Sequence, residues 1–135
     1  MLKLTVVTPE KKLVTDVEVD DLLVPGNRGE LNILTGHAPL MTTLSTGVVQ
    51  FKRKGSNVVE RIAVSWGYCE VANDVVNILA ETAETPIEID LSRAENSFKN
   101  SEKALSGDVG GDELEKYRLK RERALVRISV ARINH

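Results

Sequence analysis

The residues that could act as a nucleophile or a general base are few in this chain. It contains one cysteine, Cys69, and two histidines, His37 and His135. Cys69 lies in an apolar segment without a neighbouring basic residue, so we expect a buried structural thiol. His37 stands in a predicted Gly-His-Ala-Pro turn, where a lone histidine more often makes contacts than acts as a base. No local spacing indicates a Cys–His or Ser–His pair, so we expect no catalytic residue.

Motifs for metal and phosphate binding are also missing from the sequence. The chain has no CxxC pair and no histidine cluster, and Asp20 and Asp21 point to opposite faces of a predicted strand. Residues 26–29 read Gly-Asn-Arg-Gly, but they lack the Lys-Ser/Thr into which a Walker loop continues. The sequence therefore predicts no metal site, no required cofactor and no enzymatic activity of its own.

Basic side chains gather near the C-terminal end of the chain. Residues 113–135 contain seven Lys or Arg and three Asp or Glu. These basic residues include Lys116, Arg118, Lys120, Arg121, Arg123 and Arg127. They favour either a solvated helix face or an arm that binds an acidic protein surface, a membrane surface or a bound polyphosphate. RNA binding is the least favoured function, because interleaved aromatic residues are missing.

Composition narrows the class of protein further. The chain has 135 residues, of which 41% are hydrophobic and 28% charged, and its net charge is −2. This suits one domain, or a small domain with an appendage, and disfavours a general nucleic-acid binder. No window reaches the roughly 18 apolar residues of a membrane span, and we see no signal peptide or import leader. With a single cysteine, we expect a soluble protein of a reducing compartment.

The chain up to about residue 86 shows the periodicity of strands. Leu2, Leu4 and Val6 alternate with Lys3, Thr5 and Val7, and short β-branched runs follow as far as Leu79. Turn residues at 54–57 and 72–74 predict two hairpins. Many short strands separated by turns predict an antiparallel β-sandwich or barrel over residues 1–86.

The pattern changes from residue 87 onward. Asp90 is a good N-cap for a helix that runs to about Leu105, and a Gly-rich break follows at 106–111. Asp112 and Glu115 then predict a capping box for a second helix. Together they form an antiparallel two-helix hairpin over residues 87–135. Neither helix has a broad apolar face, so we expect a mobile regulatory arm that can detach.

One long segment makes the chain recognisable. Residues 25–47 read PGNRGELNILTGHAPLMTTLSTG, which strongly resembles the signature of the ε subunit of the F-type ATP synthase, of bacterial or plastid type. The segments SWGYCEV at 65–71, NDVVNILAET at 73–82 and IEIDLSRA at 87–94 are similar to further family segments. Asn32, Thr35 and Trp66 depart from the family's usual Gly, Pro and Gly. The resemblance covers essentially the whole chain.

The resemblance implies a fold and a role. It implies an antiparallel β-sandwich of about ten strands followed by the helical hairpin, in a non-catalytic central-stalk (rotor) subunit. The sandwich would bind the γ subunit and rest on the c-subunit ring, with Glu30 and His37 in loops that face the ring. The hairpin would inhibit ATP hydrolysis as its basic residues meet the β (and α) subunits. The subunit would couple the catalytic head to the c ring during proton-driven ATP synthesis, and would associate with the membrane only through the complex.

Some bacterial members of this family also bind ATP in the folded hairpin, at an I/L-D-x-x-R-A motif. The resemblance makes seven residues candidates for this site: Glu84, Ile89, Asp90, Arg93, Ala94, Arg123 and Arg127. The alternative is that Asp90 is simply an N-cap and Arg93 a salt-bridge residue. ATP is thus a candidate regulatory ligand and not a required cofactor.

Location and function each have a second interpretation. The resemblance implies the cytoplasmic face of the bacterial inner membrane, with the stromal side of the plastid thylakoid as the alternative. The alternative function is a free-standing module that binds a small molecule and uses the helical hairpin as a lid. Co-purification with a γ subunit would distinguish the two functions.

Overall fold

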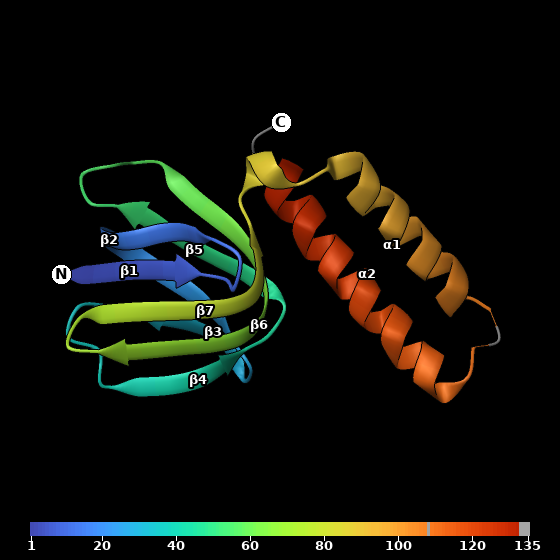
Figure 1. Ribbon diagram of the computed structural model, residues 1–135, viewed down its shortest axis with the longest axis horizontal. Coiled ribbons are helices and arrows are strands. Elements are labelled where there is room, and N and C mark those ends of the chain that lie inside the picture. Colours follow the sequence, from blue (N-terminus) through green and yellow to red (C-terminus); the bar gives the residue numbers. More distant parts are fainter. Residues whose placement is uncertain (108, 133–135) are drawn as a thin grey trace. The chain divides into compact units, whose positions relative to one another are not determined.

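The chain forms two compact units (Figure 1). A computed structural model describes residues 1–107 and 109–132. The first unit is Met1–Ala83 and the second begins at Glu84, slightly upstream of the boundary expected between residues 86 and 87. Residues 108 and 133–135, which belong to the predicted Gly-rich break and to the predicted arm, lie outside the described residues.

The first unit is a β-sandwich made by one folded sheet (Figure 1). Within the described residues the sheet has seven strands. They are β1 (Leu2–Val7), β2 (Lys12–Gly26), β3 (Gly29–Ile33), β4 (Leu40–Leu44), β5 (Gly47–Arg53), β6 (Val59–Ala72) and β7 (Val75–Glu84). The two long strands, β2 and β6, join the layers, because β2 pairs with β1, β3 and β5, and β6 pairs with both β4 and β5.

The expected sandwich is confirmed, but two of its details are wrong. The sheet is mixed and not strictly antiparallel, since β1 pairs with β7 in parallel. The strands number seven in the described chain instead of about ten, because β2 and β6 continue through bends. Asp16 and Asp21 have positive φ and lie at the register shifts of β2. Such bulges turn a strand from one partner to the next without ending it.

The alternation seen in the sequence places one set of side chains inside the sandwich. Leu2, Leu4 and Val6 of β1 are buried, and so is Phe51 of β5, which follows from the two-residue period of a strand. Both predicted hairpins are present, β5–β6 and β6–β7. Asn73 and Asp74 form the second turn with φ values of 51° and 63°, as a tight two-residue turn requires.

The second unit contains a short 3₁₀ helix, η1 (Pro86–Glu88), and the helices α1 (Leu91–Leu105) and α2 (Gly111–Arg132). Figure 1 shows α1 and α2 side by side and antiparallel, as the sequence predicted. Asp90 caps α1, because its carboxylate accepts the backbone N–H of Arg93. The capping box expected for α2 is not placed as predicted. The helix begins at Gly111, so Asp112 lies within its first turn, where an acidic residue still favours the helix dipole.

The contact between α1 and α2 is made by small residues and ion pairs. Ala94 and Ser101 are the buried residues of α1, and the Ser101 hydroxyl donates to the carbonyl oxygen of Ser97 at 2.8 Å. Arg121 of α2 reaches Glu102 of α1 at 2.7 Å, and Arg132 lies 3.8 Å from Glu95. Small buried side chains contribute little hydrophobic free energy, and ion pairs as exposed as these add only about 0.5 kcal/mol each.

Candidate functional site

Four candidate ATP residues, Ile89, Asp90, Arg93 and Ala94, lie at or next to the N-terminus of α1. Asp90 Oδ1 accepts the Arg93 backbone N–H at 3.0 Å, so at least one carboxylate oxygen is already used by the cap. Ile89 and Ala94 are buried. The arrangement agrees with the N-cap interpretation of Asp90, and it leaves the guanidinium of Arg93 at the surface.

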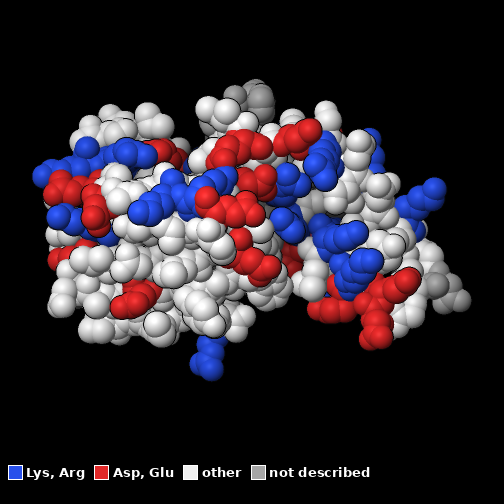
Figure 2. All heavy atoms as spheres, in the orientation of Figure 1, with Lys and Arg blue, Asp and Glu red and all other residues white. Residues whose placement is uncertain are grey.

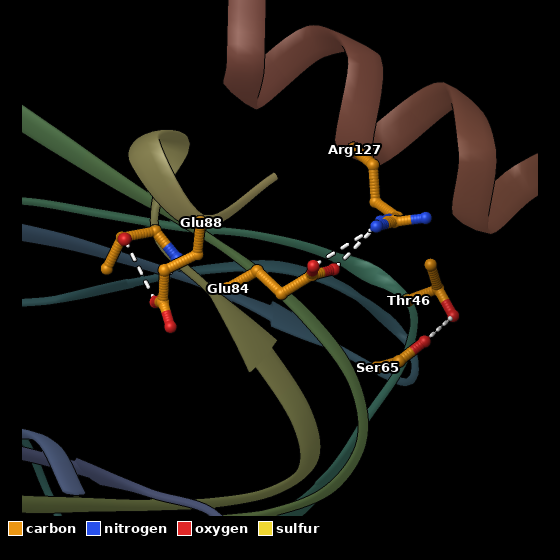
Figure 3. Close-up of polar contacts among 6 residues, drawn as sticks. Thr46, Ser65, Glu84, Glu88 and Arg127 are labelled. Carbon is orange, nitrogen blue, oxygen red and sulfur yellow. Dashed lines mark hydrogen bonds and ion pairs between the residues drawn. The ribbon is translucent and has the colours of Figure 1, made fainter. Parts of the chain in front are cut away.

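Glu84 and Arg127 form a bidentate, largely buried ion pair in the second unit (Figure 3). Arg127 donates from Nε to Glu84 Oε1 at 2.8 Å and from Nη2 to Oε2 at 3.1 Å. Their side chains are only 20% and 24% exposed. Two parallel hydrogen bonds of this kind fix the orientation of the guanidinium, and the carboxylate neutralises its charge. The structure therefore brings together two candidate residues that stand 43 positions apart in the chain.

The remaining candidates are not gathered with that pair. Arg93 lines a polar groove of about 260 Å³ between α1 and α2, together with Asn96, Asn100, Tyr117 and Lys120. Arg123 is exposed and does not line the groove. Groove-lining amides and cations have the chemistry to hold phosphate or ribose oxygens. Asn96, Asn100 and Tyr117 were not predicted from the sequence as site residues, and Lys120 was predicted only as part of the basic arm. The sequence shows that these residues recur with helical spacing, but only the packing of α1 against α2 shows that they line one groove.

The basic residues of α2 are partly neutralised within the hairpin. Arg118 lies 3.9 Å from Glu115, and Arg121 and Arg127 pair with Glu102 and Glu84. Lys116 and Lys120 flank the Tyr117 ring at 5.9 Å and 5.8 Å, a favourable placement for ammonium groups. On the face drawn in Figure 2, acidic and basic side chains lie next to each other over the helical unit. On this face the folded hairpin presents a mixed surface and not a continuous basic one.

Glu30 and His37 lie at opposite ends of β3. Glu30 is a strand residue paired with Pro25, and not a loop residue as expected. His37 lies in the loop after β3, where Nδ1 donates to the Ala38 carbonyl oxygen at 2.7 Å. Asp74 anchors this loop, because its Oδ1 accepts the Gly36 N–H at 2.7 Å. That hydrogen bond is the main reason why the pKa of the Asp74 carboxyl lies below its ordinary value.

An exposed apolar face on the sandwich was not predicted from the sequence. Met41, Trp66, Tyr68 and Leu79 are 69%, 47%, 55% and 49% exposed. Trp66, Tyr68 and Leu79 also line an open cavity of about 780 Å³. Exposed aromatic residues gathered in this way are typical of protein interfaces. The alternation along β6 and β7 already separated these side chains from the core, but it did not show which outer face is free.

The single thiol has the structural role expected for it. Cys69 is fully buried, and burial raises the pKa of its thiol to about 11. Among the described residues, no three His, Cys, Asp or Glu side chains lie close enough together to hold a metal ion. Within the same residues, neither helix is both long enough and apolar enough to cross a membrane.

The structure belongs to the class of proteins in which a β-sandwich is followed by a charged two-helix hairpin. Comparisons with known proteins agree with this class. Residues 1–86 match the family described as ATP synthase, Delta/Epsilon chain, beta-sandwich domain. The chain belongs to this family, which confirms the resemblance found in the sequence.

Relatives extend the match along the chain. The ATP synthase epsilon chain of Bdellovibrio bacteriovorus is 49% identical over 112 residues, covering 83% of this chain and 80% of the relative. That of Geotalea daltonii is 44% identical over 131 residues, covering 96% and 93%. Both relatives are named as epsilon chains of ATP synthase, which favours the predicted role of an accessory subunit over a free-standing binding module with a lid.

Two solved structures share the fold at low sequence identity. One is the mitochondrial ATP synthase of Euglena gracilis (OSCP, F1 and c ring), with a TM-score of 0.80, 19% identity and coverage of 96% of this chain and 80% of that one. The other is the central stalk and c ring of the Tetrahymena thermophila mitochondrial enzyme, with a TM-score of 0.64, 14% identity and coverage of 98% and 95%.

Proposed function

We propose that this chain is a rotor subunit of a proton-translocating F-type ATP synthase, which couples the catalytic head to the c ring. The observation that carries the proposal is its 44% identity to a bacterial epsilon chain over 93% of that chain's length. Sequence conservation of this extent across both units supports a shared role for sandwich and hairpin. The partners are then the γ subunit, the c ring and, through the hairpin, the β and α subunits.

The apolar face supports binding of the γ subunit by the sandwich. Met41, Trp66, Tyr68 and Leu79 together offer a half-exposed aromatic and aliphatic surface. Burying such a surface is the usual source of affinity between subunits that stay together. Mixtures of the chain with γ should form a stable equimolar complex, and substitution of Tyr68 by serine should weaken it, whereas Lys103→Gln in α1 should not.

The loop that contains His37 supports a role at the c ring. The hydrogen bond from the Gly36 N–H to Asp74 holds the loop in one conformation. A loop that is ordered before binding loses less conformational entropy when it contacts the ring. Glu30 is proposed as a second contact, although it lies at the other end of β3. A cysteine at position 37 should form cross-links to cysteines placed on the facing surface of the c ring if the proposal holds.

The hairpin is proposed as the arm that inhibits ATP hydrolysis. Its basic residues are candidates for contact with acidic residues of the β subunit: Lys116, Arg118, Lys120, Arg121, Arg123 and Arg127. Arg121 and Arg127 would exchange Glu102 and Glu84 for carboxylates of the partner, an exchange between two states of similar energy. Deletion of residues 90–135 should leave the complex assembled and raise its ATP hydrolysis. Unchanged hydrolysis would remove the inhibitory role and leave the coupling role in place.

ATP is proposed as a regulatory ligand of the folded hairpin. The polar groove beside Arg93 and the Glu84–Arg127 pair offer cations for phosphate groups. Calorimetric titration of the chain with MgATP should give saturable heat that Arg93→Gln and Arg127→Gln abolish, while Lys52→Gln on the sandwich leaves it unchanged. Absence of heat at millimolar ligand would exclude the site.

The proposed location follows from the proposed assembly. The curated relatives are bacterial, which supports the cytoplasmic face of the inner membrane over the stromal face of a plastid thylakoid. The chain would be peripheral there, and held through its protein partners. Membrane washes with chaotropic salt should release it together with the catalytic head.

A further inference from the structure

Trp66 has an unusual backbone conformation for a residue of its size. Its φ is +57°, in the left-handed region that bulky side chains avoid. Among the described residues, the other non-glycine residues with positive φ are Asp16, Asp21, Asn73 and Asp74, whose short polar side chains tolerate this region. Strain at one bulky residue often marks a functional constraint.

The strain has a clear structural origin. β6 pairs with β5 as far as Val64 and with β4 from Gly67 onward, so residues 65 and 66 form the corner between the two layers. Gly67 has a φ of +134°, and any Cβ there would overlap the carbonyl oxygen of Leu79. The close approach of β7 therefore fixes the corner. A glycine at position 66 would adopt the required φ without cost.

Only about half of the Trp66 side chain is buried within the folded chain, so packing in the sandwich does not account for the strained backbone. The Trp66 side chain is 47% exposed and forms a wall of the cavity beside Tyr68 and Leu79. A tryptophan that served packing alone would bury most of its ring. The exposed half of the indole ring is therefore available for contact with a partner protein.

We propose that Trp66 is the anchor residue of the interface with the γ subunit, and that it receives an apolar side chain of γ next to a basic one. This rests on the proposed function of the chain. Glu81 lines the same cavity, and Glu70 shares the outward face of β6 with Tyr68 because strand residues two apart point the same way. Neither carboxylate forms an ion pair with another residue in the described part of the chain. A cation of the partner beside its apolar side chain would complement both.

The experiment uses the fact that Trp66 is the chain's one tryptophan. Full-length protein labelled with 5-fluorotryptophan is titrated with unlabelled γ subunit of the same ATP synthase, and the ¹⁹F signal reports on position 66 alone. Affinities for γ are measured in parallel for the wild type, Trp66→Gly and Asp16→Gly. The second variant is the matched control, because it also places glycine at a positive φ but on another part of the sandwich.

The expected results separate binding from folding. Wild type should bind γ with a shifted ¹⁹F signal, and Trp66→Gly should bind about thirty-fold more weakly or worse while its melting temperature is unchanged or raised. Asp16→Gly should bind like the wild type. If wild type binds but the signal does not shift and Trp66→Gly binds equally well, the inference is overturned and the proposed function stands. A wild type that does not bind γ overturns the proposed function itself. A signal that shifts with protein concentration, without γ, assigns the face to a second copy of this chain and overturns the inference.

Discussion

Replacing Glu84 by glutamine removes the charge that holds Arg127, without changing the shape of the side chain. The ion pair is bidentate at 2.8 Å and 3.1 Å, and its side chains are 20% and 24% exposed. Water screens such a pair less than a surface pair, so its loss should cost the second unit about 1.5 kcal/mol of unfolding free energy. The matched control is Glu102→Gln. Its partner Arg121 lies at a similar 2.7 Å, but both side chains are 47% exposed, which predicts a loss of about 0.5 kcal/mol or less.

Amide hydrogen exchange measures both changes in the same helix. The α2 amides near Ile128 should exchange about tenfold faster in Glu84→Gln than in the wild type, since about 1.4 kcal/mol corresponds to one decade. In Glu102→Gln the rates should rise about twofold at most. Addition of salt should reduce the smaller effect more than the larger one. Equal effects of the two variants would refute the reasoning, because burial would then not decide the strength of the pair.

Three further perturbations test the sandwich. Asp74→Asn keeps a residue that tolerates the left-handed turn but removes a carboxylate whose pKa lies below its ordinary 3.8, chiefly because of the Gly36 N–H. The stability that the carboxylate contributes should be complete above the unfolded pKa and lost as the pH falls toward the lower folded one, so melting curves of wild type and variant should converge in acid; a constant gap would contradict this. Cys69, with a pKa of about 11, should resist iodoacetamide at neutral pH until urea unfolds the chain, and rapid labelling of the native protein would show that the thiol is accessible. Gly67→Ala should cost about 3 kcal/mol or more in urea unfolding, because its Cβ meets the Leu79 carbonyl oxygen at a φ that alanine avoids; a loss below about 1 kcal/mol would mean that the corner of β6 can relax.

The sequence predicted those turns and helix ends whose conformation depends on a few neighbouring residues. The turn at Asn73-Asp74 and the cap at Asp90 each lie where predicted, because a tight turn and an N-cap need particular residue types at particular positions. The parallel pairing of β1 with β7 was not predicted, since it joins Lys3 to Val75 and no local pattern specifies such a contact. The expected number of about ten strands came from the resemblance to the family. In the structure Asp16 and Asp21 form bulges inside β2, so that the strand continues through its bends without ending.

The candidate site likewise contains residues that local sequence patterns predict and residues that only the packing of distant segments brings together. Asp90 and Arg93 could be found by their spacing within one helix turn, and the structure joins them by a hydrogen bond. The pairing of Glu84 with Arg127 depends on how α2 packs, and only the resemblance to a family brought both residues into one candidate site. Trp66 stood out in the sequence as a departure from the family's usual glycine. Its strain and its place on a free face became visible only with the bend of β6.

The central claim is that this chain is a rotor subunit of an ATP synthase. The most direct test is to purify the full-length chain, through an affinity tag, from detergent extracts of the membranes that contain it. The account predicts that the γ subunit and the c ring are recovered with it in fixed stoichiometry, together with the ATP-hydrolysing head. Recovery of the chain alone, under conditions that keep the rest of the ATP synthase assembled, would contradict the account.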